Sequence, residues 1–454
     1  MKIVIAGNGK VGYALAEQLS REEHDVTVID NNEDVLERSE ELLDVMTVYG
    51  NGASLETQTL ANVSEADLLI AATSADEINI LSCLLARKLG CKQTIARVRN
   101  PEYGAQLQFL KDDLGLSMTF SPDRSAAHAI FRVLQFPSFL KLDSFARSRI
   151  ELVELSITPG SALDGIVLDH LYEIAKVKLL VCCVDRAGII SIPRGGFVLK
   201  SGDKISVTAA TRDLAKMIRN LDISSLKIKN VMICGSSPVT EYLAEELIES
   251  RVNVKIVAHN LERCKQISEN IPQAIVICGD YKDEKLMLTE GISKVDAYVA
   301  LTDYDEDNIV LSLYAGRMGA KKSVACVDRS ELIPILQGWN TSSIVSPKHI
   351  TVNEVLRFVR ALDKSAGGSM ITMHSIMDGK AEALEFEASE GTKHMDVPLA
   401  KLRLKPNILI SCITHGGDVI IPKESDCIRK GDSVVVVTKA DSVLSELNDI
   451  FLAE

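Results

Sequence analysis

The chain has 454 residues, and at about 100–200 residues per domain this length predicts two to four domains. The hydrophobic content of 46% and charged content of 25% exclude a disordered, collagen-like or wholly coiled-coil chain. The net charge of −13 and aromatic content of 4% argue against nucleic acid as a partner, because such proteins need a basic surface. The sequence has no apolar run long enough to span a bilayer, so a cytoplasmic location is expected.

The first part of the chain alternates apolar runs with helical patterns. Apolar runs predict strands at 2–6, 25–30, 45–49, 68–72 and 94–98. Apolar residues at helical spacing predict helices at 12–20, 32–42, 54–62, 76–89 and 101–114. Strands that are apolar throughout and alternate with helices favour a parallel sheet covered on both faces. Residues 2–6 are therefore expected to be the first strand of this sheet rather than part of a signal peptide.

A different pattern follows. A helix is predicted at 125–136, just before Pro137. Short runs at 150–157, 179–185, 189–193 and 204–208 are predicted as strands, separated by the turn signals Ala187-Gly188 and Ser201-Gly202-Asp203. This pattern is typical of a small antiparallel α+β module.

The second half of the chain repeats the first. Matching residues lie 229 positions apart, as in Thr73 and Thr302, Asn79 and Asn308, Ile192-Pro193 and Ile421-Pro422, and Gly202-Asp203 and Gly431-Asp432. A constant offset over the chain indicates that a unit of about 225 residues was duplicated. The repeat predicts strands at 383–388, 408–414, 419–422 and 433–438.

The predicted fold class is α/β, with two Rossmann-like doubly wound parallel sheets, each followed by a small α+β module. The predicted segments are a nucleotide-binding Rossmann domain at 1–124, connecting helices at 125–149, a small module at 150–228, a second Rossmann domain at 229–349, a connecting helix at 350–369 and a second small module at 370–454.

A glycine loop between the first strand and first helix predicts a nucleotide site. Gly7, Asn8, Gly9, Lys10, Val11 and Gly12 fit the pattern G-x-G-x-x-G. In this pattern the first glycine allows a tight turn, the second lets the backbone approach a pyrophosphate, and the third lets the helix pack closely. The N-terminus of the helix then offers free N–H groups to phosphates.

An acid at the end of the second strand supports this prediction. Asp30 lies 18 residues after Gly12, where a carboxylate binds ribose hydroxyls and repels a 2′-phosphate, so NAD(H) or another adenine nucleotide is favoured over NADP. Asn31 and Asn32 are candidates for the ribose or for capping the next helix. The remaining candidates follow later strands: Gly50, Asn51, Ala72, Thr73, Arg97 and Arg99. Strand alternation predicts that the two arginines share one face, where a phosphate or solvent is their partner.

The second copy has lost these features. Ser237 and Thr240 stand where the second and third glycines are expected, and Ala258 stands where the ribose acid is expected. The second Rossmann domain is therefore expected to be structural or to bind a different ligand. The small modules contain no recognisable catalytic set and no metal-binding histidine pair, so a nucleotide-binding protein without enzymatic activity is expected.

The whole pattern resembles the RCK (KTN) domain family of the TrkA type. The resemblance rests on the glycine loop 7–12, on Asp30, on the stretch 71–79 and on the repeated Ile-Pro…Gly-Asp pattern of the two small modules. It implies an NAD-binding N-terminal domain and a C-terminal RCK_C module, each present twice, in a protein without catalytic activity. Asn51 departs from the family, because many relatives have aspartate there.

The resemblance also implies partners. Members are cytoplasmic and peripheral to the membrane, and they regulate a TrkH-like membrane potassium-transport subunit as a homo-oligomer, a tetramer or ring. NAD(H), ATP or ADP binding changes the shape of that ring. Three alternatives stay open: an NAD-dependent oxidoreductase, a nucleotide or redox sensor acting on transcription, and a regulator of another cation transporter.

Overall fold

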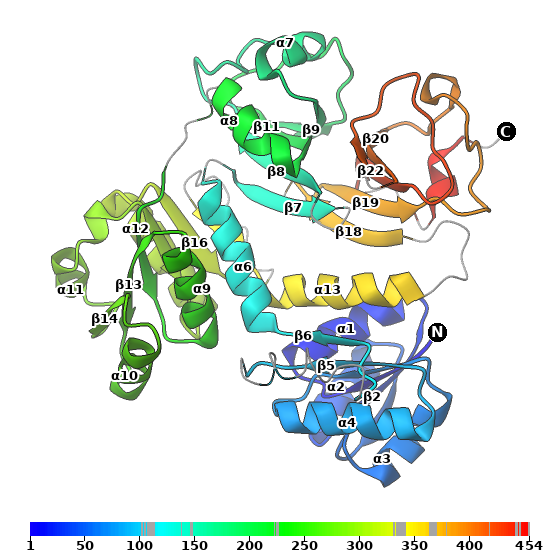
Figure 1. The fold of residues 1–454 in the computed structure, drawn as a ribbon, viewed down its shortest axis with the longest axis vertical. Coiled ribbons are helices and arrows are strands. Elements are labelled where there is room, and N and C mark those ends of the chain that lie inside the picture. Colours follow the sequence, from blue (N-terminus) through cyan, green and yellow to red (C-terminus); the bar gives the residue numbers. More distant parts are fainter. Residues whose placement is uncertain are drawn as a thin grey trace.

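The computed structural model contains four sheets in two repeated halves (Figure 1). It describes the chain except residues 101–102, 104–105, 107–113, 138, 146–148, 222, 224–226, 330–331, 333–341, 363–369, 378, 417, 441–443, 445 and 453–454. Among the described residues, no helix has the length and apolar character needed to cross a membrane.

The first Rossmann-like unit is a six-stranded parallel sheet in the order β3-β2-β1-β4-β5-β6. Its strands are β1 Lys2–Ala6, β2 Asp25–Asp30, β3 Met46–Tyr49, β4 Leu68–Ala71, β5 Gln93–Arg97 and β6 Met118–Phe120. Its helices are α1 Lys10–Arg21, α2 Glu33–Leu42, α3 Leu55–Leu60 and α4 Asp76–Leu89. The predicted doubly wound sheet is confirmed, whereas the helix predicted at 101–114 falls mostly outside the described residues.

The first small module is a five-stranded antiparallel sheet in the order β10-β9-β11-β8-β7. Its strands are β7 Lys141–Phe145, β8 Ile150–Ser156, β9 Leu179–Arg186, β10 Ile189–Ser191 and β11 Lys204–Ala210, with helices α7 Leu171–Ala175 and α8 Leu214–Asn220. The segment 125–149 was predicted to be helical, and this is wrong in part. It contains one helix, α6 Pro122–Gln135, followed by strand β7, which pairs with β8.

The second half repeats both sheets. Its parallel sheet, in the order β14-β13-β12-β15-β16-β17, contains β12 Asn230–Cys234, β13 Asn253–Ala258, β14 Ile275–Cys278, β15 Ala297–Ala300, β16 Lys322–Cys326 and β17 Ser342–Val345. Its helices are α9 Pro238–Glu249, α10 Leu261–Asn270, α11 Glu284–Thr289, α12 Asp305–Met318 and α13 Pro347–Leu362. The antiparallel sheet, in the order β18-β19-β22-β20-β21, contains β18 Met370–Ile376, β19 Ala381–Glu387, β20 Ile408–His415, β21 Asp418–Ile420 and β22 Ser433–Lys439. The same strand orders in both halves confirm the duplication.

The two halves exchange their connecting helices. Helix α6 of the first half packs on α9 of the second Rossmann-like unit, and α13 of the second half packs on α1 of the first (Figure 1). The buried face of α13, with Val355 and Val359, joins the core that contains Leu15 and Leu19 of α1. Each Rossmann core is thus completed by the helix of the other half, which the sequence did not predict.

The two small modules also share a core. It contains Phe145 and Leu152 from the first module and Ile376 and Val437 from the second. Strands β7 and β18 meet there, where His374 Nδ1 lies 3.2 Å from Asp143 Oδ1. Because helix exchange and this shared core both link the halves, a change in the first Rossmann-like unit is connected to both modules through packed elements.

Candidate nucleotide site

A cavity of about 540 Å³ lies at the carboxyl ends of β1, β2 and β4 in the first Rossmann-like unit. This is where the strand order reverses and where open α/β sheets bind their ligands. Ten of the predicted site residues line it: Gly7, Asn8, Gly9, Asp30, Asn31, Gly50, Asn51, Ala72, Thr73 and Arg97. The lining also includes Ile29, Asn32, Val35, Gly52, Ser74, Ala75 and Ile78, of which only Asn32 was a predicted candidate for ligand contact.

The three loop glycines are needed for different reasons. A Cβ on Gly7, whose φ is +100°, would lie 2.7 Å from the backbone N of Thr73, and one on Gly12 would lie 1.9 Å from the Gly7 carbonyl oxygen. A Cβ on Gly9 would meet no protein atom within 4 Å, although Gly9 lines the cavity. Gly7 and Gly12 are therefore required by packing within the protein, whereas at Gly9 open space is left beside the loop.

Helix α1 presents an uncapped N-terminus to this space. Its N-cap residue is Gly9, no side chain accepts a hydrogen bond from the first turn, and that turn contains no acid. No side chain of the first turn therefore offsets the partial positive charge of the helix dipole, which suits a phosphate group. Lys10 and Val11 are not in the cavity lining, since Lys10 is exposed at the helix start and Val11 is buried in the core.

Asp30 is oriented by the backbone around it. Its Oδ2 accepts a hydrogen bond from the backbone N of Asn8 at 2.6 Å, and its Oδ1 accepts one from the backbone N of Asn32 at 3.0 Å. A carboxylate oxygen can accept more than one hydrogen bond, so both oxygens keep capacity for a ribose hydroxyl. The carboxylate is thus fixed beside the glycine loop before any ligand arrives.

The Asn8 side chain connects the glycine loop to helix α2 by hydrogen bonds. Its side chain is 1% exposed, and Nδ2 donates to Val35 O at 3.2 Å and to Ser39 Oγ at 2.7 Å. Its Oδ1 is buried without a hydrogen-bond partner among the described residues. A buried acceptor without a partner is costly, so this oxygen adds to the cost of holding the loop in this conformation.

A polar clamp holds the ends of β4 and β5 together. Asn79 Oδ1 accepts from the backbone N and the hydroxyl of Thr73, while Asn79 Nδ2 donates to the carbonyl oxygens of Thr73 and Arg97, all at 2.7–3.2 Å. One buried amide therefore sets the positions of two lining residues. In the sequence Asn79 stood out as a repeated residue and as part of the stretch 71–79, but it was not predicted to have this role.

Gln58 supports the loop after β3 in a similar way. Its Nε2 donates to Gly52 O at 2.7 Å and to Ser82 O at 2.9 Å, and its side chain is buried. A Cβ on Gly52 would lie 2.8 Å from Ala6 Cβ, so this loop packs closely on β1. Asn51 Oδ1 accepts from the backbone N of Ala53 at 2.9 Å and thus stabilises the turn.

The two predicted arginines differ in whether they line the cavity. Arg97 lines the cavity, and its Nε is buried without a partner among the described residues. Burial and the neighbouring Arg99 lower the pKa of the Arg97 guanidinium, and the carboxylates of Asp123 and Asp76 only partly offset this. Arg99 Nε instead lies 2.7 Å from Asp123 Oδ2, outside the cavity lining. The predicted shared face stays a prediction, although Arg97 lies close enough to Arg99 and Asp123 for both charges to act on its guanidinium.

Family models and relatives identify the chain. The family model of the TrkA-N domain matches residues 3–122 and 231–347, and that of the TrkA-C domain matches residues 152–222. A relative named Trk system potassium uptake protein TrkA homolog 1, from Methanosarcina mazei, is 33% identical over 99% of this chain and 100% of its own length. The chain belongs to the TrkA family. The Trk system potassium uptake protein TrkA of Vibrio alginolyticus is 31% identical over 99% of this chain and 98% of its own length.

Solved structures share the fold of this TrkA-family chain. A structure described as the GsuK channel bound to NAD has a TM-score of 0.62 at 18% identity, covering 97% of this chain and 77% of that chain. The TrkA-C family model matches only the first small module, but the second has the same strand order. Both modules therefore have the same topology.

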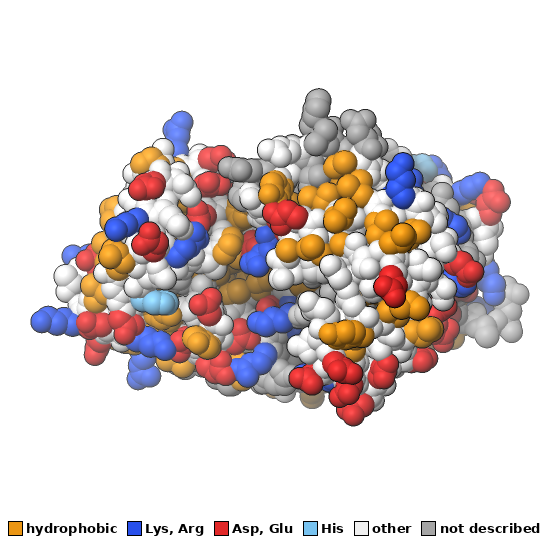
Figure 2. All heavy atoms as spheres, turned by 90° about the horizontal axis from the view of Figure 1, so that it is seen from below, with side chains coloured by type: hydrophobic (Ala, Val, Ile, Leu, Met, Phe, Trp, Pro, Cys, Tyr) orange, Lys and Arg blue, Asp and Glu red, His pale blue; other side chains and the backbone are white. Residues whose placement is uncertain are grey.

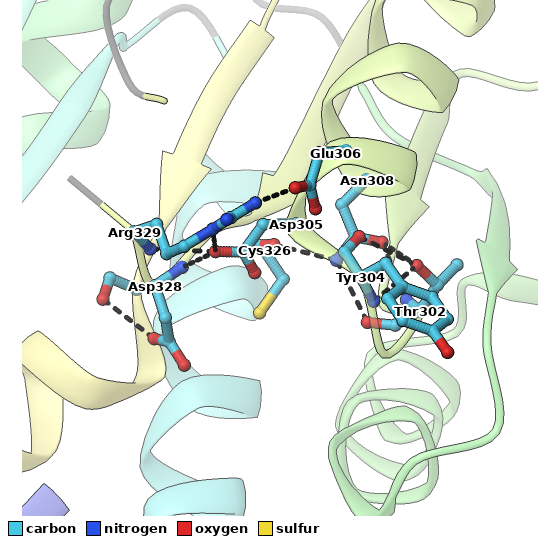
Figure 3. Close-up of polar contacts among 9 residues, drawn as sticks. Thr302, Tyr304, Asp305, Glu306, Asn308, Cys326, Asp328 and Arg329 are labelled. Carbon is cyan, nitrogen blue, oxygen red and sulfur yellow. Dashed lines mark hydrogen bonds and ion pairs between the residues drawn. The ribbon is translucent and has the colours of Figure 1, made fainter. Parts of the chain in front are cut away.

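The second TrkA-N domain keeps the polar clamp but not the cation. Figure 3 shows Asn308 beside Thr302 in the arrangement that Asn79 and Thr73 have in the first domain. The position of Arg97 is taken by Cys326, whose carbonyl accepts from Asn308 Nδ2 at 2.8 Å. Arg329, further along, pairs with Glu306. The structural part of the site is retained, while the unpaired cation is lost.

The loop of the second TrkA-N domain is closed by its own side chains. Thr240 is buried where Gly12 lies in the first domain, and its hydroxyl donates to Gly235 O at 3.3 Å. The Arg263 guanidinium donates to Ser236 O at 3.1 and 3.3 Å and pairs with Glu241. Ala258 ends β13 where Asp30 ends β2. The second loop therefore differs from the first in having no carboxylate at the end of β13, no glycine at its N-cap and an acid, Glu241, in the first helical turn.

Catalytic groups are not gathered around the first cavity. Asp30 is the one carboxylate in its lining, which contains no histidine and no cysteine. Among the described residues, no group of three or more histidine, cysteine, aspartate or glutamate side chains could hold a metal ion. The cavity offers groups that bind phosphate and ribose.

Proposed function

We propose that this protein is a nucleotide-binding regulatory subunit of a membrane potassium-uptake transporter and is not an enzyme. The observation that carries the proposal is the first cavity, where an uncapped helix N-terminus, Asp30 and the unpaired Arg97 surround one space. Membership of the TrkA family supports the potassium-transport role, since its curated relatives are named as potassium uptake proteins. In this role the protein is cytoplasmic and peripheral to the membrane through the transporter.

The ligand proposed for the first cavity is NAD(H), with ATP or ADP as further candidates. The N-terminus of α1 and the space at Gly9 receive the pyrophosphate, and Asp30 accepts hydrogen bonds from the ribose hydroxyls. Arg97 supplies the positive charge for a phosphate oxygen. Lys10, Val11 and Gly12 act through the backbone of the first helical turn, and Arg99 supports the site through Asp123. Solved relatives by fold are described as bound to NAD and to ADP.

A structural route connects this ligand to the small modules. Helix α1 meets the ligand at its N-terminus, and its buried face packs on α13, which lies in the other half of the chain. Helix α13 also contacts β18, the edge strand of the second module. A ligand shifts a two-state protein by its differential affinity for the two states, and coupling between sites is typically about 1–3 kcal/mol.

The proposed partners are a TrkH-like potassium-transport subunit and further copies of this chain, in a tetramer or ring. Figure 2, which views the molecule from the side of the first TrkA-N domain, shows apolar side chains gathered on its surface. Large apolar side chains exposed on this domain are Leu42, Met46, Tyr49, Leu55, Leu60 and Leu81. Where exposed apolar side chains form a contiguous patch, they are typical of protein interfaces.

The test is reconstitution with a transporter. The chain should co-purify with a TrkH-like subunit expressed beside it, and potassium flux through the complex in vesicles should change when NADH, ATP or ADP is added. An Asp30→Ala chain should still co-purify but no longer transmit the nucleotide effect. Two results would contradict the proposal. One is that the protein alone reduces NAD with a panel of hydroxy acids or alcohols, and the other is that potassium flux does not change with any of the three nucleotides.

A further inference from the structure

The exchanged helices α6 and α13 end in different surroundings. Both begin with Ser-Pro, at Ser121-Pro122 and Ser346-Pro347, so Gln135 of α6 matches Arg360 of α13. The helices on which they pack, α9 and α1, end at the matching residues Ser250 and Glu22. The two helix pairs can therefore be compared position by position.

At the α13–α1 contact, an ion pair fills the space between the helix ends. The Arg360 guanidinium donates to both carboxylate oxygens of Glu22, and Arg360 is only 7% exposed. Hydrogen bonds from Arg360 help lower the pKa of Glu22, although burial opposes them. This buried pair occupies the positions that Gln135 and Ser250 have at the other contact.

At the α6–α9 contact, Gln135 and Ser250 replace this pair and a crevice of about 370 Å³ lies between the helix ends. Half of its lining residues are apolar, with Phe131 and Leu134 from α6, Leu247 from α9, and Ile228 and Val252 from the adjoining segments. The volume is in the range of pockets that hold small ligands, about 300–1,000 Å³, and is too small for a folded partner.

The rim of this crevice is cationic. Lys227, Lys229 and Arg251 line it, and no aspartate or glutamate does. Among the described residues, none of these three side chains has an ion-pair partner. Asp296 accepts from the backbone N of Lys229 at 3.0 Å, but its side-chain ion pair is with Lys321. Three unpaired cations around one apolar space stand out in a chain with a net charge of −13.

We propose that the crevice between α6 and α9 binds a small amphipathic anion, with an apolar body against Phe131 and Leu247 and a carboxylate, sulfonate or phosphate head at Arg251 and Lys229. An apolar cavity with a few convergent charged groups is the usual form of a small-molecule site. The ligand bridges a helix of the first half and a domain of the second. It therefore stabilises the exchanged arrangement, independently of the nucleotide site.

The probe for this site is 1-anilinonaphthalene-8-sulfonate, an aromatic anion whose fluorescence rises in apolar surroundings. Its uncharged analogue, N-phenyl-1-naphthylamine, is the matched probe without the anionic head. Fluorescence titrations of the full chain should give saturable binding of the sulfonate, at least tenfold tighter than that of the uncharged analogue. Tenfold corresponds to about 1.4 kcal/mol.

Three variants locate the binding. Arg251→Glu should weaken sulfonate binding at least tenfold. The double change Gln135→Arg with Ser250→Glu, which copies the Arg360–Glu22 pair, should remove it by filling the crevice. Lys265→Glu, an exposed charge reversal on α10 of the same domain, should leave it unchanged. Thermal unfolding without the probe checks that each variant is folded.

The proposal is wrong if both probes bind wild-type protein equally well, if no saturable sulfonate binding is seen, or if folded Arg251→Glu binds as tightly as wild type. The comparison of the two probes needs no variant, so it decides the matter even if the double variant does not fold. Because neither nucleotide nor potassium is used, failure here leaves the proposed regulatory function untouched.

Discussion

Gly9 and Gly12 offer a paired test of the nucleotide site, because the structure gives them opposite roles. A Cβ on Gly9 meets nothing within 4 Å, and its φ of −72° and ψ of −167° are open to any residue. Gly9→Ala should therefore leave the free energy of unfolding unchanged or raise it by about 0.4–1 kcal/mol, because alanine reduces the conformational entropy of the unfolded chain. A Cβ on Gly12 lies 1.9 Å from Gly7 O, so Gly12→Ala should cost about 1–3 kcal/mol or more.

Denaturant unfolding and calorimetric titration with NADH and ATP separate these effects. Gly9→Ala should keep the unfolding midpoint of the wild type but lose at least tenfold in nucleotide affinity, about 1.4 kcal/mol, because the new methyl group fills the space for the pyrophosphate. Gly12→Ala should lower the midpoint. If Gly9→Ala binds both nucleotides as tightly as wild type, phosphates do not approach the loop and the reasoning fails.

Three further predictions concern charged side chains. Arg97→Met should weaken nucleotide binding and reduce its dependence on salt, measured by titrations at several ionic strengths; an unchanged salt dependence would exclude a phosphate contact. Glu22→Gln should lower the free energy of unfolding by about 1.5–3 kcal/mol at pH 7. Because the pKa of folded Glu22 is lowered, this stabilisation is present above the usual glutamate range and fades as pH falls through the folded pKa, so variant and wild type should converge in acid. Burial lowers the pKa of Lys322 to about 7, so the unfolded chain binds more protons between about pH 7 and 10, and wild-type stability should rise across that window. The melting temperature of Lys322→Met should not rise with pH across this window. If it rises as much as that of the wild type, Lys322 is not the group responsible.

The sequence predicted the first site because its signals are local. The glycine loop and Asp30 follow directly from where two apolar strands end, and a parallel sheet brings such ends together. The pairing of Arg99 with Asp123 was not predictable, because that carboxylate lies 24 residues further along the chain. Gly52 and Gln58 gave no recognisable motif, although both shape the cavity wall.

The exchange of helices α6 and α13 was not predictable from periodicity. An apolar helix face shows that a helix is buried but not which sheet it covers, and here each covers the sheet of the other half. Strand β7 was missed for a related reason. Its polar residue Asp143 is placed against His374 of the second module, so its burial depends on a residue of the other repeat.

The number of nucleotides bound per chain tests the central claim most directly. Calorimetric titration of the full chain with NADH, and separately with ATP, should give one site per chain, and Asp30→Ala should abolish it in a chain that still unfolds cooperatively. Ala258→Asp at the matching position of the second domain should not create a second site, because Thr240 and Arg263 still close that loop. Two equivalent sites per chain, or binding that survives Asp30→Ala at full affinity, would contradict the account.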